Sequence, residues 1–274
     1  MTVVEVADAR HKLGFVVADD YFAIGTPEDH VRVPLDPLVA TEIGDKLGFT
    51  LPTARMVDLV WQAAAVKLKP ITAPEIGIKQ GSAEQDAPPA FWKHDAAVTA
   101  QLAGRSGLAA GQKKDVILDN RLGAQPNRVA IYGWHKAPGS GGCQNPTIPG
   151  LCPIQGVSLV HENTYRDYSH GVRMVSPLAM LDGESVTLVE LLTSPTLGPI
   201  LNHGAPLKVL RQPGGAPPPK GGGSCMGIAG PCPSGTSSSG SSSSSARKAL
   251  GWLLGLAGAA AIGWAGWEAW RRHA

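Results

Sequence analysis

The chain has 274 residues, of which 43% are hydrophobic and 17% charged, and its formal net charge is +2. Its 34 Gly and 23 Pro make up about one residue in five, against roughly 12% in average proteins, which excludes a coiled coil. The near-neutral charge argues against a nucleic-acid partner, because nucleic-acid binders carry a basic stripe. The length suits one domain or two small ones.

Two strands are predicted near the N-terminus. The first 15 residues, MTVVEVADARHKLGF, contain acids early and no long apolar stretch, so we expect no secretory signal peptide. Residues 15–24 form an apolar run around FVV and YFAI, and residues 30–35 alternate between apolar and polar. Both patterns are typical of strands.

Two helices are predicted next. Asp36 is a good N-cap, Pro37 suits the first helical position, and Gly48 ends a segment whose apolar residues recur every four positions. A second helix is predicted over residues 53–63, because its first residue is a capping threonine and one face is apolar. Pro and Gly interrupt residues 70–90, which are therefore predicted to be a loop.

The rest of the globular part is predicted to be mostly strand. An Ala-rich helix is expected over residues 96–108, and residues 178–192 are expected to be partly helical, with Asp182 or Ser185 as the cap. Strand-like runs cover residues 115–118, 128–132, 157–160 and 170–175. This order predicts an α+β fold, a single globular domain over residues 1–212 with a mostly antiparallel sheet and two to four helices.

Chemically capable side chains concentrate between residues 132 and 173, where three of the eight histidines lie. Polar groups at strand ends often form a site at one sheet edge. In an enzyme, His170 or His135 would act as the general base. Arg173 would stabilise developing negative charge, and Asp167 would orient a histidine. His170 and Arg173 point to opposite faces of a regular strand, so the chain must bend between them.

Aromatic and imidazole side chains of the same stretch are candidate ligand contacts. The predicted substrate-binding residues are His161, Tyr165, Tyr168 and Trp134. In a non-catalytic protein these groups would line a binding groove or satisfy hydrogen bonds in the core. Zinc held by His135, His161 and His170 is a further alternative, but their spacing matches no metal motif, so we expect no cofactor and no metal site.

Several segments resemble an uncharacterised family of bacterial and phage proteins. They are VAIYGWH (129–135), PIQ (153–155), DYSHGVRMV (167–175) and the stretch from YFAIG to MVDLVW (21–61). The resemblance covers roughly residues 14–205 and implies no settled activity.

SHGVRM, at residues 169–174, is similar to the SHGCxR[LM] signature of L,D-transpeptidases. Those enzymes act on peptidoglycan peptides through the signature cysteine, with an upstream histidine at a strand end. The similarity implies that His135 takes the upstream histidine's place. However, the two sequences align only if the cysteine position is deleted, so the thiolate nucleophile is absent and its chemistry does not carry over.

The four cysteines form two local pairs. Cys143 and Cys152 enclose a Pro- and Gly-rich loop, and Cys225 and Cys232 enclose six residues further along the chain. Two close pairs in loop-rich segments favour two disulfides over a metal site, with four free thiols as the alternative. Disulfides indicate an oxidising location, and without a signal peptide they suit a protein delivered by another route, such as a phage virion or lysis protein.

The C-terminal part is predicted to be a tethered membrane anchor. Residues 213–246 are almost only Gly, Pro and Ser, which is typical of a flexible linker. Residues 249–267 carry no charge, and tryptophans stand at both ends of this run, so we expect a transmembrane helix within an anchor at 247–274. Gly251 and Gly255 form a GxxxG pair, which favours helix–helix self-association.

These features predict a single-pass membrane protein of the bacterial inner membrane, or one associated with phage. Basic residues flank the apolar run on both sides, so they do not decide which side the globular domain occupies. The first functional hypothesis is a hydrolase that cleaves peptide or amide bonds of the cell wall with a His/Arg/Asp site. The alternative is a non-catalytic binding or structural module of the envelope, with the cell-wall polymer as its partner in either case.

Overall fold

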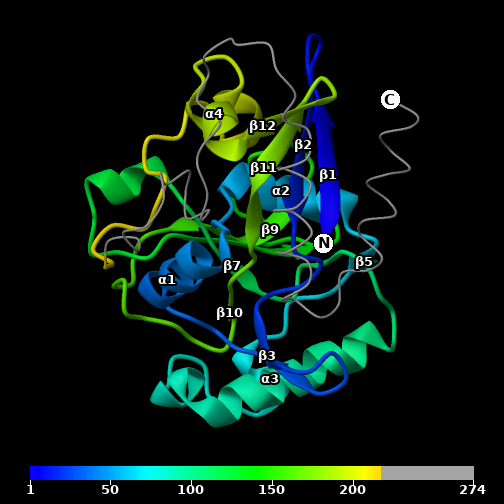
Figure 1. Cartoon of the computed structure of the whole chain (residues 1–274). Helices are drawn as coiled ribbons and strands as arrows, with labels where there is room; N and C mark the ends of the chain where they lie inside the picture. The colour runs from blue at the N-terminus through cyan, green and yellow to red at the C-terminus, as the bar shows by residue number, and fades with distance from the viewer. Residues whose placement is uncertain (217–274) are drawn as a thin grey trace.

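The computed structural model describes residues 1–216 (Figure 1). The linker from residue 217 onward, the pair Cys225 and Cys232, and the predicted membrane helix lie outside the described residues. Within residues 1–216, no helix has both the length and the hydropathy that a membrane span requires.

The described part is α+β and its strands pair mostly in antiparallel fashion, which confirms the predicted fold class. The α-helices are α1 (Pro37–Leu47), α2 (Ala54–Ala63), α3 (Pro88–Leu102), α4 (Leu188–Thr193) and α5 (Gly198–Leu201). The longer strands are β1 (Thr2–Ala7), β2 (Lys12–Val17), β8 (Ile131–Lys136), β9 (Cys152–Ser158), β11 (Val175–Leu181) and β12 (Glu184–Thr187). The short strands are β3 (Ala23–Gly25), β4 (His30–Arg32), β5 (Val66–Lys67), β6 (Ala109–Ala110), β7 (Lys114–Val116) and β10 (His170–Gly171).

Two four-stranded sheets carry the fold. The first has the order β1-β2-β11-β12, and its β1–β2 hairpin stands beside β11 in Figure 1. The second has the order β10-β7-β8-β9. The chain passes from the second sheet to the first between β10 and β11, where Phe22 N donates to Val172 O at 2.8 Å and Ala18 N donates to Met174 O at 2.9 Å. This crossing segment lies in the core and fixes the two sheets to each other.

The first two helices begin where their caps predict. The Asp36 carboxylate accepts the backbone N–H groups of Leu38 and Val39, and Gly48 ends α1 with a φ of 75°, in the left-handed region that glycine adopts without strain. Thr53 Oγ1 accepts Met56 N at 3.2 Å at the start of α2. Helix α2 packs on β8 and contributes most of one face to the core.

The third and fourth helix predictions were partly wrong. Helix α3 begins at Pro88, inside the predicted loop, because proline is tolerated in a first helical turn. Residues 178–187 form the β11–β12 hairpin, and Asp182 lies in its turn with a φ of 51° instead of capping a helix. The cap of α4 is Thr187, which forms a capping box with Glu190.

The five α-helices exceed the two to four that were expected, and β1 was not predicted. The fifth helix, α5, has four residues and no side-chain cap, so no local signal marks it. The predicted strand over 170–175 is divided, since β10 and β11 belong to different sheets. The tertiary structure decided this division, because strand pairing is a long-range property.

Candidate functional site

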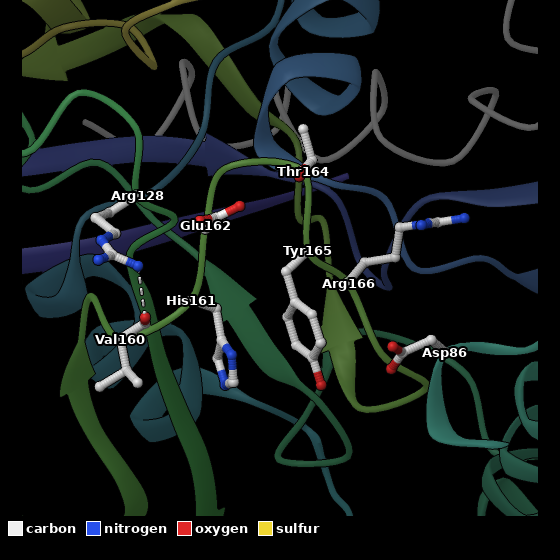
Figure 2. Close-up of a pocket in the computed structure, with 8 residues that line it drawn as sticks. All are labelled: Asp86, Arg128, Val160, His161, Glu162, Thr164, Tyr165 and Arg166. Atoms are coloured by element: carbon white, nitrogen blue, oxygen red, sulfur yellow. Dashed lines mark hydrogen bonds between the residues drawn. The ribbon is translucent and has the colours of Figure 1, made fainter. Parts of the chain in front are cut away.

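A pocket of about 350 Å³ opens beside the segment that connects β9 to β10 (Figure 2). Its lining residues are mostly polar or charged: Asp86, Arg128, Val160, His161, Glu162, Thr164, Tyr165 and Arg166. Two of the predicted substrate-binding residues, His161 and Tyr165, are among them. The other two, Tyr168 and Trp134, do not line this pocket.

His161 and Tyr165 form a stacked pair in the pocket wall (Figure 2). Their ring centroids lie 4.1 Å apart at an interplanar angle of 14°. A tight turn brings them together, because Tyr165 N donates to Glu162 O at 3.0 Å. Both side chains are partly exposed, so the pair presents an aromatic and imidazole surface to a ligand.

Charges of both signs surround this pair. Asp86 and Glu162 provide carboxylates, and Arg128 and Arg166 provide guanidinium groups. Burial, together with repulsion from Asp167, raises the pKa of Asp86. A polar pocket with acids and bases in one wall matches a ligand that carries both an ammonium and a carboxylate.

His170 lies directly behind Tyr165. Its ring makes an edge contact with the Tyr165 ring at a centroid distance of 5.6 Å, and the residue is fully buried. Burial lowers the pKa of His170 to about 4, so the imidazole is neutral at physiological pH. Within the described residues, neither ring nitrogen of His170 has a hydrogen-bond partner.

Asp167 lies beside His170 and is nearly inaccessible to solvent. It accepts hydrogen bonds from Ser169 N at 2.8 Å and Ser169 Oγ at 2.5 Å, and from the Tyr165 hydroxyl at 3.2 Å. Burial opposes its ionisation, but His170, Lys114 and the Ser169 hydrogen bonds lower the pKa of Asp167 to about 2. The carboxylate is therefore ionised throughout the physiological range.

Strand register fixes the face on which His170 lies. His170 pairs with Lys114, and the next pair is Gly171 with Asp115, which in turn pairs with Tyr132. Because paired residues share a face and successive residues alternate, His170 and Lys114 face one way, and Asp115 and Tyr132 face the other. On the His170 face, Lys114 Nζ lies 4.7 Å from the centroid of a tryptophan ring, that of Trp134.

His135 lies on the opposite face from His170. Trp134 has a φ of 57°, which breaks the regular alternation of β8, so that Tyr132 and His135 both reach Asp58 of α2. His135 Nε2 lies 2.6 Å from Asp58 Oδ1, and the His135 ring stacks on Trp61 at a centroid distance of 5.3 Å. His135 is thus fixed in an internal contact.

The Asp58 carboxylate is fully buried and accepts several hydrogen bonds. Besides Tyr132 and His135, Thr147 Oγ1 and Thr147 N donate to Oδ2 at 2.7 Å each. Burial opposes ionisation, but the hydrogen bonds from His135 and Thr147 outweigh it and lower the pKa of Asp58. Sequence reasoning missed Asp58, because at helical spacing it shares a polar side of the predicted helix with Arg55 and Gln62.

The loop that carries Thr147 is closed by a disulfide. Cys143 and Cys152 are bonded, with their Cα atoms 4.6 Å apart, as the sequence predicted. The bridge joins the loop to the first residue of β9. It therefore holds in place the loop whose Thr147 side chain covers Asp58.

Arg173 also faces inward, away from the pocket. Its guanidinium donates to Ala18 O at 2.8 Å and to Ala109 O at 2.7 Å, and it lies 4.2 Å from the centroid of the Tyr21 ring. The Tyr21 hydroxyl donates to Asp115 Oδ2 at 2.8 Å. These contacts join the two sheets, and they leave Arg173 with no approach to the pocket wall.

The predicted catalytic set is therefore divided. His170 and Asp167 remain neighbours behind the pocket, whereas His135 and Arg173 belong to internal networks on the other face of the sheet. The structure does not bring these four side chains to one point, and their catalytic role stays a prediction. Within residues 1–216, no group of three or more His, Cys, Asp and Glu side chains is placed to hold a metal ion, so the three histidines do not form a shared ligand set.

The other two predicted ligand contacts, Tyr168 and Trp134, are buried and take part in internal hydrogen bonds. The Tyr168 carbonyl accepts Lys113 Nζ at 2.7 Å, and the Trp134 indole donates to Gln112 O at 3.2 Å. Lys113 is itself buried, and burial lowers the pKa of its ammonium to about 7 against the opposing effect of Asp95. The sequence left Lys113 unassigned, since paired lysines are usually solvated.

A comparison of the chain with protein-family models, with curated proteins and with solved structures yields no match.

Proposed function

We propose that this protein is a non-catalytic, membrane-anchored module of the bacterial or phage-associated cell envelope, and that its pocket binds a zwitterionic peptide group of the cell wall. The observation that carries the proposal is the stacked pair of His161 and Tyr165 in a wall that contains carboxylates and guanidinium groups. Stacked rings provide contact area, and charges of both signs select a ligand that carries both.

The placement of the other candidate groups favours binding over hydrolysis. A general base must reach the proton that it removes, yet His135 is held by Asp58 and both are buried. Arg173 donates to backbone carbonyls, so it is not available to stabilise charge on a ligand in the pocket. Chemistry in the pocket would have to proceed without either group.

The envelope location rests on the sequence. The uncharged run over residues 249–267 supports a membrane anchor, and the Gly-, Pro- and Ser-rich segment before it supports a flexible tether. A tethered binding domain samples a volume around its anchor and so reaches a polymer that lies near the membrane. The two features together fit a module that holds cell-wall material close to the bilayer.

The binding arm of the test uses the full-length protein and soluble disaccharide-peptides released from cell-wall sacculi, with titration calorimetry as the readout. We expect His161→Ala to weaken binding about tenfold, because it removes an imidazole ring that lines the pocket. Trp92→Ala is the matched control, since Trp92 is an exposed aromatic residue that does not line the pocket. Fragments with acetylated amino groups should bind more weakly. No binding, or equal affinity in all variants, would contradict the proposal.

The catalytic arm incubates the same protein with intact sacculi, with and without a chelator, and measures released fragments. We expect no release above the level of the His170→Ala variant. Release that requires His170 would overturn the non-catalytic proposal and support the hydrolase hypothesis.

A further inference from the structure

Two buried histidines of this protein share an unusual property. Both residues, His94 and His170, are fully buried, and neither ring makes a hydrogen bond of good geometry among the described residues, although the His94 ring also interacts with the Gln112 backbone. An unpaired polar group in the interior is destabilising, so each such group calls for an explanation. The two differ in what covers them.

A different tyrosine lies over each histidine ring: a buried one over His94 and a partly exposed one over His170. The His94 ring contacts Tyr168, which is 1% exposed, at a centroid distance of 5.3 Å. The His170 ring contacts Tyr165, which is partly exposed and lines the pocket. Rotation of the Tyr165 side chain into solvent would therefore join His170 to the pocket, while no such movement is open to Tyr168.

The contacts of the Tyr165 side chain lie at the pocket wall. Its hydroxyl donates to Asp167 at 3.2 Å and also interacts with Asp86, which lines the pocket, and its ring stacks on His161, which is itself partly exposed. Removal of the hydroxyl leaves Asp167 with the two Ser169 donors and a free acceptor position. Lys114, the register partner of His170, adds a positive charge on the same face.

We propose that Tyr165 is a movable cover and that His170 and Asp167 form an inner part of the pocket, which receives the zwitterionic head of an amino acid. The ligand ammonium replaces the tyrosine hydroxyl on Asp167. The ligand carboxylate accepts an N–H from the neutral His170 ring and lies near the Lys114 ammonium. This inference rests on the proposed binding function and identifies the groups that recognise the ligand.

The first experiment needs no ligand and compares His170 with His94 in one molecule. The full-length protein is treated with diethylpyrocarbonate, which modifies accessible neutral imidazoles, and the modification of each histidine is followed by mass spectrometry. If Tyr165 opens, His170 reacts at least tenfold faster than His94. Equal rates would mean that both histidines react only on unfolding, which would overturn the proposal.

Variants of the cover provide the control. Tyr165→Ala removes the ring and should increase the His170 rate severalfold, whereas Tyr165→Phe loses only the hydroxyl contacts with Asp167 and Asp86 and should produce a smaller increase. The His94 rate should stay at its wild-type value in both, which shows that the variants are folded. A His170 rate that is unchanged in Tyr165→Ala would contradict the role of Tyr165.

The second experiment repeats the modification with saturating disaccharide-peptide. Protection of His170 is the expected result, because the bound ligand fills the inner part of the pocket and blocks the approach of the reagent to the ring. If calorimetry detects binding but His170 is not protected, the inner part of the pocket is not used and this inference fails, while the proposed function stands. If calorimetry detects no binding, the proposed function itself fails.

Discussion

His135 Nε2 lies 2.6 Å from Asp58 Oδ1, on the face of the sheet opposite His170. This contact joins β8 to α2, and the hydrogen bonds from Thr147 to the same carboxylate add the loop between β8 and β9. A buried carboxylate is costly unless it is paired, and here several donors from β8 and the β8–β9 loop satisfy it. The network around Asp58 is therefore a structural centre of the domain.

Replacement of Asp58 should destabilise the protein strongly. We expect Asp58→Ala to lower the free energy of unfolding by about 3–5 kcal/mol, because the buried donors of Tyr132, Thr147 and His135 lose their acceptor. Urea titration measures this change. Glu42→Ala is the matched control, since its i,i+4 pair with Lys46 is exposed to solvent and contributes little to stability. Similar losses in the two variants would contradict the assigned role of Asp58.

Loss of the Cys143–Cys152 disulfide should have a moderate effect. The bridge closes a short loop, with a sequence separation of 9, and the loss of its constraint on the unfolded chain corresponds to about 2–3 kcal/mol. The Cys143→Ser/Cys152→Ser double variant isolates this bridge from the other two cysteines. Urea titrations of the wild type and the double variant, both without reductant, test the value. Equal urea unfolding midpoints in the two proteins would contradict the stabilising effect of the Cys143–Cys152 disulfide.

Gly171 should not tolerate a side chain. A Cβ at this position would lie 2.5 Å from Cδ1 of Tyr21 and 2.9 Å from Cβ of Lys113, so the Tyr21 ring would have to move. We expect Gly171→Ala to cost about 1–3 kcal/mol or more through overpacking. Gly123→Ala is the control, because the nearest atom to its added Cβ is 3.4 Å away. Thermal unfolding of both variants would show whether only the first is destabilised.

The pH dependence of stability should contain two opposing contributions. The unfolded His170 imidazole binds a proton at its ordinary pKa of 6.5, but burial lowers the folded pKa to about 4, so stability rises as the pH increases between these values. Burial raises the pKa of Asp115 from 3.8 to about 6, so its contribution falls as the pH increases over that range. The two slopes partly cancel in the wild type.

Single variants should separate these contributions. Asp115→Asn keeps an acceptor for the Tyr21 hydroxyl and removes the stability contribution of Asp115, which decreases as the pH rises. The increase of stability between pH 4 and 6 should therefore become steeper. His170→Gln should flatten the rise, although His94, whose pKa is also lowered by burial, still contributes to it. Urea titrations at several pH values between 4 and 6.5 provide the slopes. If the slope of unfolding free energy against pH were the same in both variants as in the wild type, the contributions assigned to Asp115 and His170 would be refuted.

The sequence alone determined the features that depend on local chemistry. Asp36, Gly48 and Thr53 predicted the ends of α1 and α2, because caps act within a few residues of the chain. The pairing of Cys143 with Cys152 followed in the same way from two thiols at the ends of one short loop. The concentration of chemically capable side chains between residues 132 and 173 is likewise visible in the sequence, and the role of these side chains as a site stays a prediction.

Only the tertiary structure decided which of those polar groups meet. The left-handed backbone of Trp134 turns His135 toward Asp58, and the register of β10 on β7 places His170 on the other face. No local pattern specifies either result, because strand register depends on partners that are distant in the sequence. The division of the predicted catalytic residues between the two faces of the sheet is the consequence of these two long-range choices.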